Sequence, residues 1–250
     1  MRLKNKVAIV TGGSRDIGRS VCVKLAGEGA KVVINYFGNE ANAQETLKEV
    51  TAAGGEGIIV KADVTKASDV DHLVQEALKA FGSEIHILVN VAGGMVARKT
   101  VLEMDEAFWD TVMDLNLKSV FLAVNKTLPH MPAGSSIVNL ASLAGRDGGG
   151  PGASVYATSK GAVMTYTRAL AKELGPKNIR VNAVAPGMIA TTFHDTFSRP
   201  EVRTNVANAT ALKREGTADE VAGLVAYLAG PESGYITGAS VDINGGLNFS

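Results

Sequence analysis

Tyr156 and Lys160, four residues apart, form the pair of side chains with the clearest capacity for chemistry. Residues at i and i+4 lie on one face of a helix, so the phenol and the ammonium project together if this segment is helical. A tyrosine has a pKa near ~10 in solution, too high for ready proton exchange at neutral pH. A close ammonium stabilises phenolate, and lowering that pKa by ~3 units corresponds to about 4 kcal/mol. The spacing therefore predicts an acid–base tyrosine with a lowered pKa, although it also fits an ordinary pair on a helix surface.

Two polar residues earlier in the chain favour a shared site with this pair. Ser142 follows a predicted strand, Ile137–Leu140, and lies 14 residues before Tyr156, so the strand end and the helix start can meet. Asn116 lies in the middle of a predicted helix, where asparagine is unfavourable and indicates either a specific task or a buried amide that satisfies backbone groups. Ser154 is the alternative to Ser142, but its place in a glycine-rich loop disfavours it.

A parallel sheet is the element that must position these residues. Short runs rich in Val and Ile alternate with longer helical patterns along the whole chain, which is typical of a parallel sheet covered on both faces. With right-handed crossovers, this predicts an α/β fold, a single doubly wound (Rossmann-like) sheet of about seven strands with helices on both faces, in one domain over residues 1–250. The expected strands are Val7–Val10, Lys31–Asn35, Gly57–Lys61, Ile85–Asn90, Ile137–Leu140, Arg180–Val184 and Ser240–Ile243. The expected helices are Ile17–Glu28, Glu40–Ala52, Ala67–Ala80, Asp105–Leu128, Val155–Leu174 and Ala218–Leu228.

A glycine-rich turn joins the first predicted strand to the first helix. It reads Thr-Gly-Gly-Ser-Arg-Asp-Ile-Gly over residues 11–18. Glycines let the backbone approach a pyrophosphate, whose charge the helix amino terminus stabilises. Tight strand-to-helix turns also need glycine, but the position at the head of an alternating β/α chain favours dinucleotide binding.

The end of the second predicted strand indicates which dinucleotide is bound. A site for NAD usually carries an Asp or Glu about ~20 residues beyond the glycines, which binds the ribose 2′-hydroxyl. Residues Ile34–Gly38 read Ile-Asn-Tyr-Phe-Gly and contain no acid. Arg15 in the glycine turn could face a 2′-phosphate, although it also fits a solvated loop residue. The pattern therefore predicts NADP(H) rather than NAD(H).

These motifs together resemble the short-chain dehydrogenase/reductase family over nearly the whole chain. The turn is similar to that family's Thr-Gly-x-x-x-Gly-x-Gly, except that Asp16 replaces a glycine. We expect Asp16 to cap the following helix and to point away from the phosphates. Asn90-Val91-Ala92-Gly93 is similar to the family's Asn-Asn-Ala-Gly, and Ala185–Thr191 is similar to its Pro-Gly-x-Ile-x-Thr.

The resemblance implies a catalytic tetrad formed by Asn116, Ser142, Tyr156 and Lys160. Ser142 would hold the substrate carbonyl oxygen while Tyr156 protonates it in reduction. Lys160 would bias the tyrosine pKa and bind the nicotinamide ribose, and Asn116 would hold a water that relays protons to Lys160. The implied cofactor-binding residues are Gly12, Ser14, Arg15, Ile17, Gly18, Asn35, Asp63, Val64, Asn90, Ala92, Gly93, Tyr156, Lys160, Pro186, Ile189 and Thr191.

Within the family, the chain looks most like 3-oxoacyl-carrier-protein reductases and related small carbonyl reductases. We expect NADPH-dependent reduction of a small ketone, of 3-oxoacyl or similar type, with a substrate loop at about residues 187–211. An acidic carrier protein needs a basic landing surface, and residues 130–136 contain no Arg or Lys, so a carrier-bound substrate is one option among others. The alternatives are an NAD-linked sugar, polyol or secondary-alcohol dehydrogenase and, prompted by Asp16, a cofactor-binding sensor without turnover.

Composition excludes several other classes. The 25 Lys+Arg balance 25 Asp+Glu, so the sequence lacks the net positive charge expected of a nucleic-acid-binding protein. No run approaches the ~20 apolar residues of a membrane helix. Four scattered histidines without cysteine partners predict no metal site. The single Cys22 cannot form an intrachain disulfide, so we expect a cytoplasmic protein. Surplus apolar residues around Trp109 indicate a subunit interface, and the resemblance implies a homotetramer.

Overall fold

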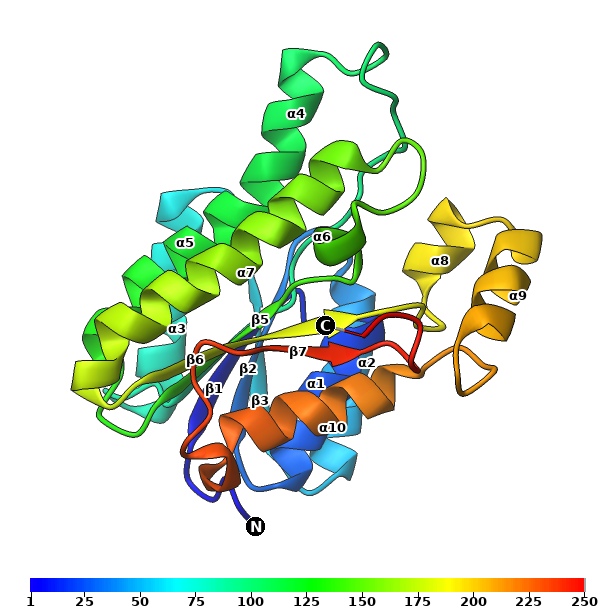
Figure 1. The fold of residues 1–250 in the computed structure, drawn as a ribbon. Coiled ribbons are helices and arrows are strands. Elements are labelled where there is room, and N and C mark those ends of the chain that lie inside the picture. Colours follow the sequence, from blue (N-terminus) through cyan, green and yellow to red (C-terminus); the bar gives the residue numbers. More distant parts are fainter. Residues whose placement is uncertain (250) are drawn as a thin grey trace.

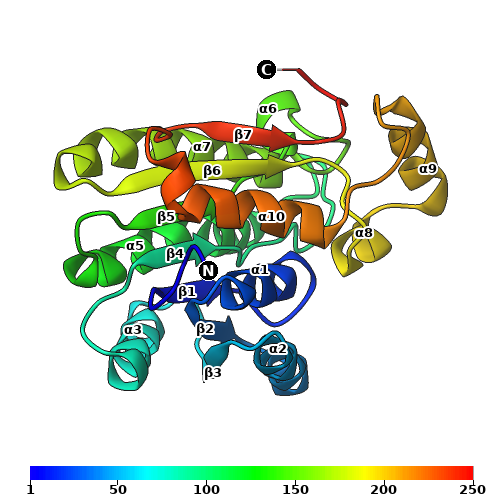
Figure 2. The same ribbon diagram turned by 90° about the horizontal axis from the view of Figure 1, so that it is seen from below.

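The computed structural model describes residues 1–249, and in these residues seven parallel strands form one sheet (Figures 1 and 2). The order across the sheet is β3-β2-β1-β4-β5-β6-β7. The chain reverses its direction of winding between β1 and β4, the point at which doubly wound sheets bind ligands at their carboxyl edge. The strands are β1 Val7–Thr11, β2 Lys31–Tyr36, β3 Glu56–Lys61, β4 Ile87–Asn90, β5 Ser136–Leu140, β6 Arg180–Pro186 and β7 Ser240–Ile243.

Helices cover both faces of the sheet, because each crossover between parallel strands returns over one face (Figure 2). One face carries α1 Asp16–Gly27, α2 Glu40–Ala52 and α10 Ala218–Ala229, packed through residues such as Leu25, Val50 and Val225. The other face carries α3 Ala67–Phe81, α5 Ser119–Thr127 and α7 Ser154–Leu174. The predicted doubly wound α/β fold is confirmed. Among the described helices, none is long and apolar enough to cross a membrane.

The predicted helix Asp105–Leu128 is interrupted. It comprises α4 Glu106–Met113, a π-helical segment Asp114–Lys118, and α5. The side-chain amide of Asn116 donates to the Val112 carbonyl oxygen (2.9 Å), the acceptor that the Asn116 backbone N–H would use in a regular α-helix. This competition accounts for the wider turn, and a π-bulge of this kind often marks a functional position.

The two irregular segments at the carboxyl edge contain short helices. The stretch from Gly145 to Ala153 begins within α6 Ala144–Asp147, and the predicted substrate loop contains α8 Thr192–Phe197 and α9 Pro200–Ala209. Figure 1 shows α8 and α9 standing apart from the helices that cover the sheet. We call residues 187–211 the lid segment.

A buried hydrogen-bond network of two side-chain amides and one hydroxyl group joins β4, β5 and α7 near the carboxyl edge of the sheet. Asn90 on β4 donates to Asn139 on β5 (2.8 Å), and Asn139 donates to the Thr167 hydroxyl on α7 (2.9 Å). All three residues are buried. Because buried polar groups need partners, this hydrogen-bond network fixes β4, β5 and α7 relative to one another.

Candidate active site

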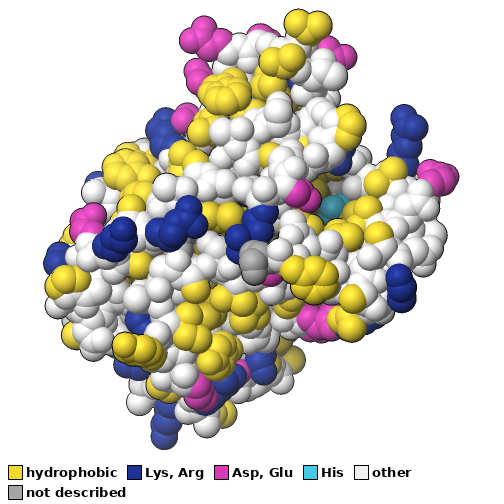
Figure 3. All heavy atoms as spheres, in the orientation of Figure 1, with side chains coloured by type: hydrophobic (Ala, Val, Ile, Leu, Met, Phe, Trp, Pro, Cys, Tyr) yellow, Lys and Arg dark blue, Asp and Glu magenta, His cyan; other side chains and the backbone are white. Residues whose placement is uncertain are grey.

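A cavity of about 470 Å³ opens at the carboxyl edge of the sheet, bounded by the β1 and β5 ends, the first turn of α7, and α8. Figure 3 shows hydrophobic side chains around the hollow beside the lid segment. Most of the residues predicted from the sequence line this one cavity. They are Gly12, Ser14, Arg15, Ile17, Gly18, Ala92, Gly93, Ser142, Tyr156, Lys160, Pro186, Ile189 and Thr191.

Tyr156 and Lys160 occupy the inner wall of this cavity. Tyr156 lies in the first turn of α7, and both side chains are buried. The Lys160 Nζ lies 5.9 Å from the centre of the Tyr156 ring and donates to the Leu140 carbonyl oxygen at the end of β5 (2.7 Å). The pair therefore projects to one side of α7, as the spacing predicted, and β5 supplies an anchor for the ammonium.

The pKa of Tyr156 differs from the sequence-based expectation. Burial raises it above its ordinary value, and a hydrogen bond with the Ser142 side chain offsets part of that increase. The expected lowering by Lys160 is therefore wrong for this structure, because desolvation of the phenolate dominates. A raised pKa keeps the phenol protonated at neutral pH, and a protonated phenol can donate to a carbonyl oxygen.

Burial also changes Lys160, whose pKa is lowered to about 8. Removing the ammonium from water disfavours its charged form. At neutral pH the group is still mostly charged, but its pKa lies close enough to neutrality for it to release and accept protons readily.

Asn116 lies just behind the cavity wall and is fully buried. Its side-chain oxygen accepts from the Gly94 N–H (2.9 Å), and its amide donates to the Gly94 carbonyl (2.8 Å). A Cβ added at Gly93 would lie 2.6 Å from the Asn116 Oδ1 and 3.1 Å from the Lys160 Nζ. Asn116 and Lys160 therefore both lie against the place that a Cβ at residue 93 would occupy, and this position has room only for glycine.

We predict that Gly93→Ala lowers the free energy of unfolding by about 1–3 kcal/mol, because the new methyl group must displace buried polar atoms. Chemical denaturation measures this change. Gly94→Ala is the matched control, because a Cβ there would come no closer than 4.0 Å to the Leu115 side chain. Equal stability of the two variants would contradict the close approach at Gly93.

The glycine-rich turn forms a cradle suited to a dinucleotide. Gly12 has φ +64°, and a Cβ there would lie 2.9 Å from the Ala92 backbone. A Cβ at Gly18 would lie 2.1 Å from the Gly12 carbonyl oxygen. The amino terminus of α1 begins in this turn, where free N–H groups attract an anion. Glycine at both positions therefore permits the close packing of the turn, and the turn lines the cavity beside the α1 amino terminus, a suitable place for a pyrophosphate.

Four predicted cofactor-binding residues lie outside the cavity lining, namely Asn35, Asp63, Val64 and Asn90. Asn35 braces the turn from behind, since its side chain accepts from the Gly12 N–H (3.1 Å) and donates to the Ala62 carbonyl (3.0 Å). Asp63 accepts from the Thr65 hydroxyl (2.7 Å), and Asn90 belongs to the buried hydrogen-bond network that joins β4, β5 and α7. Val64 packs in the core on the α3 side.

Asp16 does not cap α1, so that expectation is wrong. The N-cap is Arg15, whose side chain makes no capping hydrogen bond within the described structure. The Asp16 carboxylate instead accepts from the backbone N–H (3.1 Å) and the hydroxyl (2.5 Å) of Thr192, at the start of α8. Arg15 also donates to the Thr192 hydroxyl. Thr192 was not predicted, and because its position is 176 residues beyond Asp16 no local pattern could indicate the contact.

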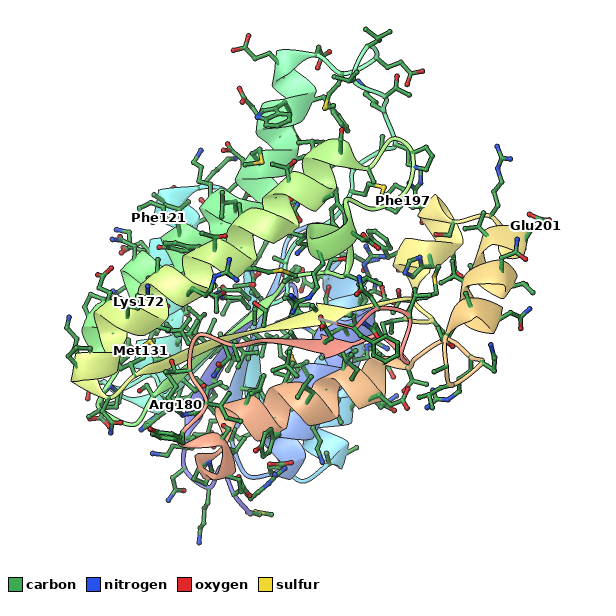
Figure 4. All side chains as sticks on the ribbon, in the orientation of Figure 1. Phe121, Met131, Lys172, Arg180, Phe197 and Glu201 are labelled. Carbon is green, nitrogen blue, oxygen red and sulfur yellow. The ribbon has the colours of Figure 1, made fainter. Side chains whose placement is uncertain are left out.

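The lid segment supplies an aromatic wall opposite the tyrosine. The Phe193 ring lies 5.8 Å from the Tyr156 ring, and Phe197 lies 5.1 Å from Phe193. Burial is the main cause that lowers the pKa of His194 to about 4, so this cavity residue is neutral at physiological pH. Arg98 donates to the carbonyl oxygen of Phe197 (2.9 Å), the last residue of α8, which is labelled in Figure 4. The space over Tyr156 is therefore apolar on one side and polar at its rim.

The described residues contain no group of three or more His, Cys, Asp or Glu side chains placed to hold a metal ion. A doubly wound sheet with a glycine cradle and a buried Tyr–Lys pair at its carboxyl edge is the architecture of a dinucleotide-dependent oxidoreductase.

Comparison with known proteins identifies the family. A family model described as enoyl-(acyl carrier protein) reductase matches residues 12–248. The 3-oxoacyl-[acyl-carrier-protein] reductase of Staphylococcus epidermidis is 38% identical over 245 residues, which cover 97% of this chain and 99% of that one. The chain belongs to the short-chain dehydrogenase/reductase family, and the protein is an oxidoreductase.

Solved structures agree with this assignment. A short-chain dehydrogenase/reductase from Serratia marcescens has a TM-score of 0.93 and 38% identity, with 99% of each chain covered. A short-chain dehydrogenase from Burkholderia cenocepacia, solved in complex with NADP, has a TM-score of 0.93 and 33% identity, with 100% of each chain covered. The seven-stranded sheet and its flanking helices are therefore shared with members of the family.

Proposed function

We propose that this protein is an NADPH-dependent carbonyl reductase that acts on a small ketone of the 3-oxoacyl type. The observation that carries the proposal is that Ser142, Tyr156 and Lys160 line the same cavity as the glycine-rich turn. The name of the Staphylococcus relative supports a 3-oxoacyl substrate. The apolar wall formed by Phe193 suits a short acyl chain beside the carbonyl group.

In the proposed reaction, Tyr156 is the general acid and Ser142 holds the substrate oxygen. Ser142 and Tyr156 line the same cavity, and Ser142 acts to lower the pKa of Tyr156, so a carbonyl oxygen placed between them would receive both hydroxyl groups. A bound nicotinamide supplies the hydride, while the protein supplies orientation and electrostatics. Lys160, with its pKa near 8, returns a proton to Tyr156 and binds the ribose, and Asn116 holds a water beside Lys160.

NADP is the proposed cofactor because the glycine-rich turn carries an arginine, whereas the end of β2 carries no Asp or Glu. Arg15 is exposed at the mouth of the cavity and β2 ends at Tyr36, without a carboxylate for a ribose 2′-hydroxyl. The NADP complex of the Burkholderia relative supports this choice. Pro186, Ile189 and Thr191, which line the other side of the cavity, are proposed to hold the nicotinamide.

We predict that Arg15→Ala weakens NADPH binding roughly 10–100-fold and leaves NADH binding nearly unchanged, because a guanidinium–phosphate contact is lost. Fluorescence titration of each reduced cofactor measures both affinities. Arg168→Ala, on the exposed face of α7, is the control and retains wild-type affinity. Unchanged NADPH affinity in Arg15→Ala would overturn the cofactor assignment.

A panel of substrates tests the reaction itself. Purified protein is assayed with NADPH and NADH against ethyl acetoacetate, acetoacetyl-coenzyme A, the same acyl group on an acyl carrier protein, and a set of sugars and polyols. The proposal expects fastest turnover with NADPH and a 3-oxo compound. Faster oxidation of a sugar or polyol with NAD would instead support the dehydrogenase alternative, and no turnover with any compound would support the sensor.

We propose that the chain acts as one domain and works in the cytoplasm as a homotetramer. Trp109 on α4 and Phe121 on α5 remain 40% and 47% exposed, and Figure 4 shows Phe121 at the outer surface of α5. A shallow cavity of about 730 Å³, lined mainly by apolar side chains of the π-helical segment, α5 and α7, adjoins Phe121. Such a surface fits a contact between subunits.

We predict that Phe121→Asp reduces the assembled mass, because a charged group would be buried at that contact. Light scattering coupled to size-exclusion chromatography measures the mass of wild type and variant. A wild-type monomer, or a variant with unchanged mass, would contradict this interface.

A further inference from the structure

The two helices of the lid segment, α8 and α9, contact the rest of the protein through partly buried side chains such as Phe193 and Phe197. Within the described chain, neither α8 nor α9 contains a buried residue, so core packing alone does not fix their position. Specific side-chain contacts must supply much of that restraint. Arg98 binds the α8 carboxyl end through the Phe197 carbonyl oxygen, and Asp16 binds the α8 amino end through Thr192.

Asp16 is unusual in its backbone as well as in its contacts. Its φ is +50°, a left-handed conformation that is unfavourable for any residue other than glycine, though less so for Asp and Asn. Both carboxylate oxygens are used on one residue, since Oδ1 accepts from the Thr192 N–H and Oδ2 from its hydroxyl. The left-handed turn thus aims an anionic acceptor pair at the first turn of α8, where backbone N–H groups lack helical partners.

The position of Thr192 ties this contact to the site. Its neighbour Thr191 lines the cavity, and its other neighbour Phe193 places an aromatic ring 5.8 Å from Tyr156. On the opposite side, Asp16 stands between Arg15 and Ile17, which also line the cavity. The Asp16 side chain, together with that of Arg15, therefore joins the glycine-rich turn to the aromatic wall over the tyrosine.

We infer that Asp16 is a positioning residue that holds the lid segment in place through Thr192, so that the aromatic wall faces Tyr156 before substrate binds. Arg15 reinforces the contact, because it lies 3.6 Å from the Asp16 carboxylate and donates to the same hydroxyl. Only the consequence for substrate affinity rests on the proposed function. The mechanical link between the turn and the lid segment does not depend on which dinucleotide or ketone is used.

Hydrogen exchange of the cofactor-free protein tests the link. In Asp16→Gly, backbone amides of residues 191–198 should exchange about tenfold faster than in wild type, because the acceptors for the α8 amino end are lost. Thr192→Val, which keeps the backbone N–H but removes the hydroxyl, should also exchange faster. Asp16→Asn keeps a side-chain oxygen and tolerates the left-handed conformation, so it should be intermediate between wild type and Asp16→Gly.

A second glycine variant controls for relief of backbone strain. Asn178 also has a positive φ, +57°, and it precedes β6, whereas the lid segment follows β6, so the two lie at opposite ends of this strand. Asn178→Gly should leave exchange at residues 191–198 unchanged. Exchange within twofold of wild type in Asp16→Gly would overturn the inference. Faster exchange of residues 191–198 in Asp16→Gly but not in Thr192→Val would assign the effect to the backbone of the glycine-rich turn. That result would also overturn the inference.

Kinetics with NADPH and ethyl acetoacetate give an independent readout. Loss of a positioning contact should raise KM for the ketone several-fold in Asp16→Gly while kcat changes less, with partial rescue in Asp16→Asn. A uniform fall in kcat alone would contradict a positioning role. If the wild type does not reduce this ketone, the proposed function fails, and the exchange measurement still decides the link.

Discussion

Tyr156→Phe is expected to lower kcat for ketone reduction about 10³-fold, because it removes the proposed general acid and leaves the apolar ring in place. The phenol is buried, and its raised pKa keeps it protonated at neutral pH. Phenylalanine retains the packing against Phe193, so the cavity shape and cofactor binding should be conserved. Single-turnover and steady-state rates with a 3-oxo substrate measure the loss.

The matched control is Tyr227→Phe, which removes a hydroxyl group on α10, away from the cavity lining. It should retain the wild-type rate. Cofactor titration shows whether Tyr156→Phe still binds NADPH, which separates a chemical defect from a folding defect. A Tyr156→Phe variant that reduces its best ketone at the wild-type rate would remove the basis of the catalytic assignment.

Lys160→Met is expected to lower kcat/KM at least about 100-fold and to change how stability depends on pH. The variant loses the ammonium that donates to the Leu140 carbonyl oxygen, which is the group proposed to return protons to Tyr156. Lys172→Met, on the same helix and labelled on its outer side in Figure 4, is the control and should keep wild-type kinetics.

The pH effect follows from the pKa of Lys160, about 8 in the folded protein against 10.5 ordinarily. Between these values the unfolded chain binds more protons, so the free energy of unfolding rises with pH across that window. Near pH 7 both states are charged and the burial penalty is present in full; by about pH 9.5 the wild type should gain about 2 kcal/mol relative to Lys160→Met. Urea denaturation of both proteins at the two pH values measures the difference. Parallel stability curves would show that the ammonium is not desolvated.

Much of the fold was predictable because strands and helices leave distinct apolar patterns. Runs such as Val7–Val10 are buried on both sides and hence continuous, while the helices that follow show one apolar face and a glycine stop. The interruption at Asn116 was not predictable, because it depends on a side-chain amide reaching the Val112 carbonyl and the Gly94 backbone. The helices in the lid segment were also missed, since they contain no fully buried residue and have no strong periodicity.

The site was predictable where chemistry depends on spacing and not where it depends on burial. Tyr156 and Lys160 had to share a helix face, and the end of β5 had to place Ser142 nearby. The direction of the Tyr156 pKa shift depends on how completely the phenol is removed from water, which no spacing reveals. Likewise, Asp16 looked like a local cap, and only the path of the chain after β6 brings Thr192 to it.

The hydrogen-bond network of Asn90, Asn139 and Thr167 fixes the register of β5 and so the position of the site at its end. Side chains alternate across a strand, so slipping β5 by one residue would turn the Asn139 amide toward the opposite face and leave two buried partners unmatched. Ser142 lies three residues beyond Asn139 and would slip with it, away from the tyrosine. The spacing of the Ser142 and Tyr156 hydroxyl groups therefore depends on three buried residues, none of which lines the cavity.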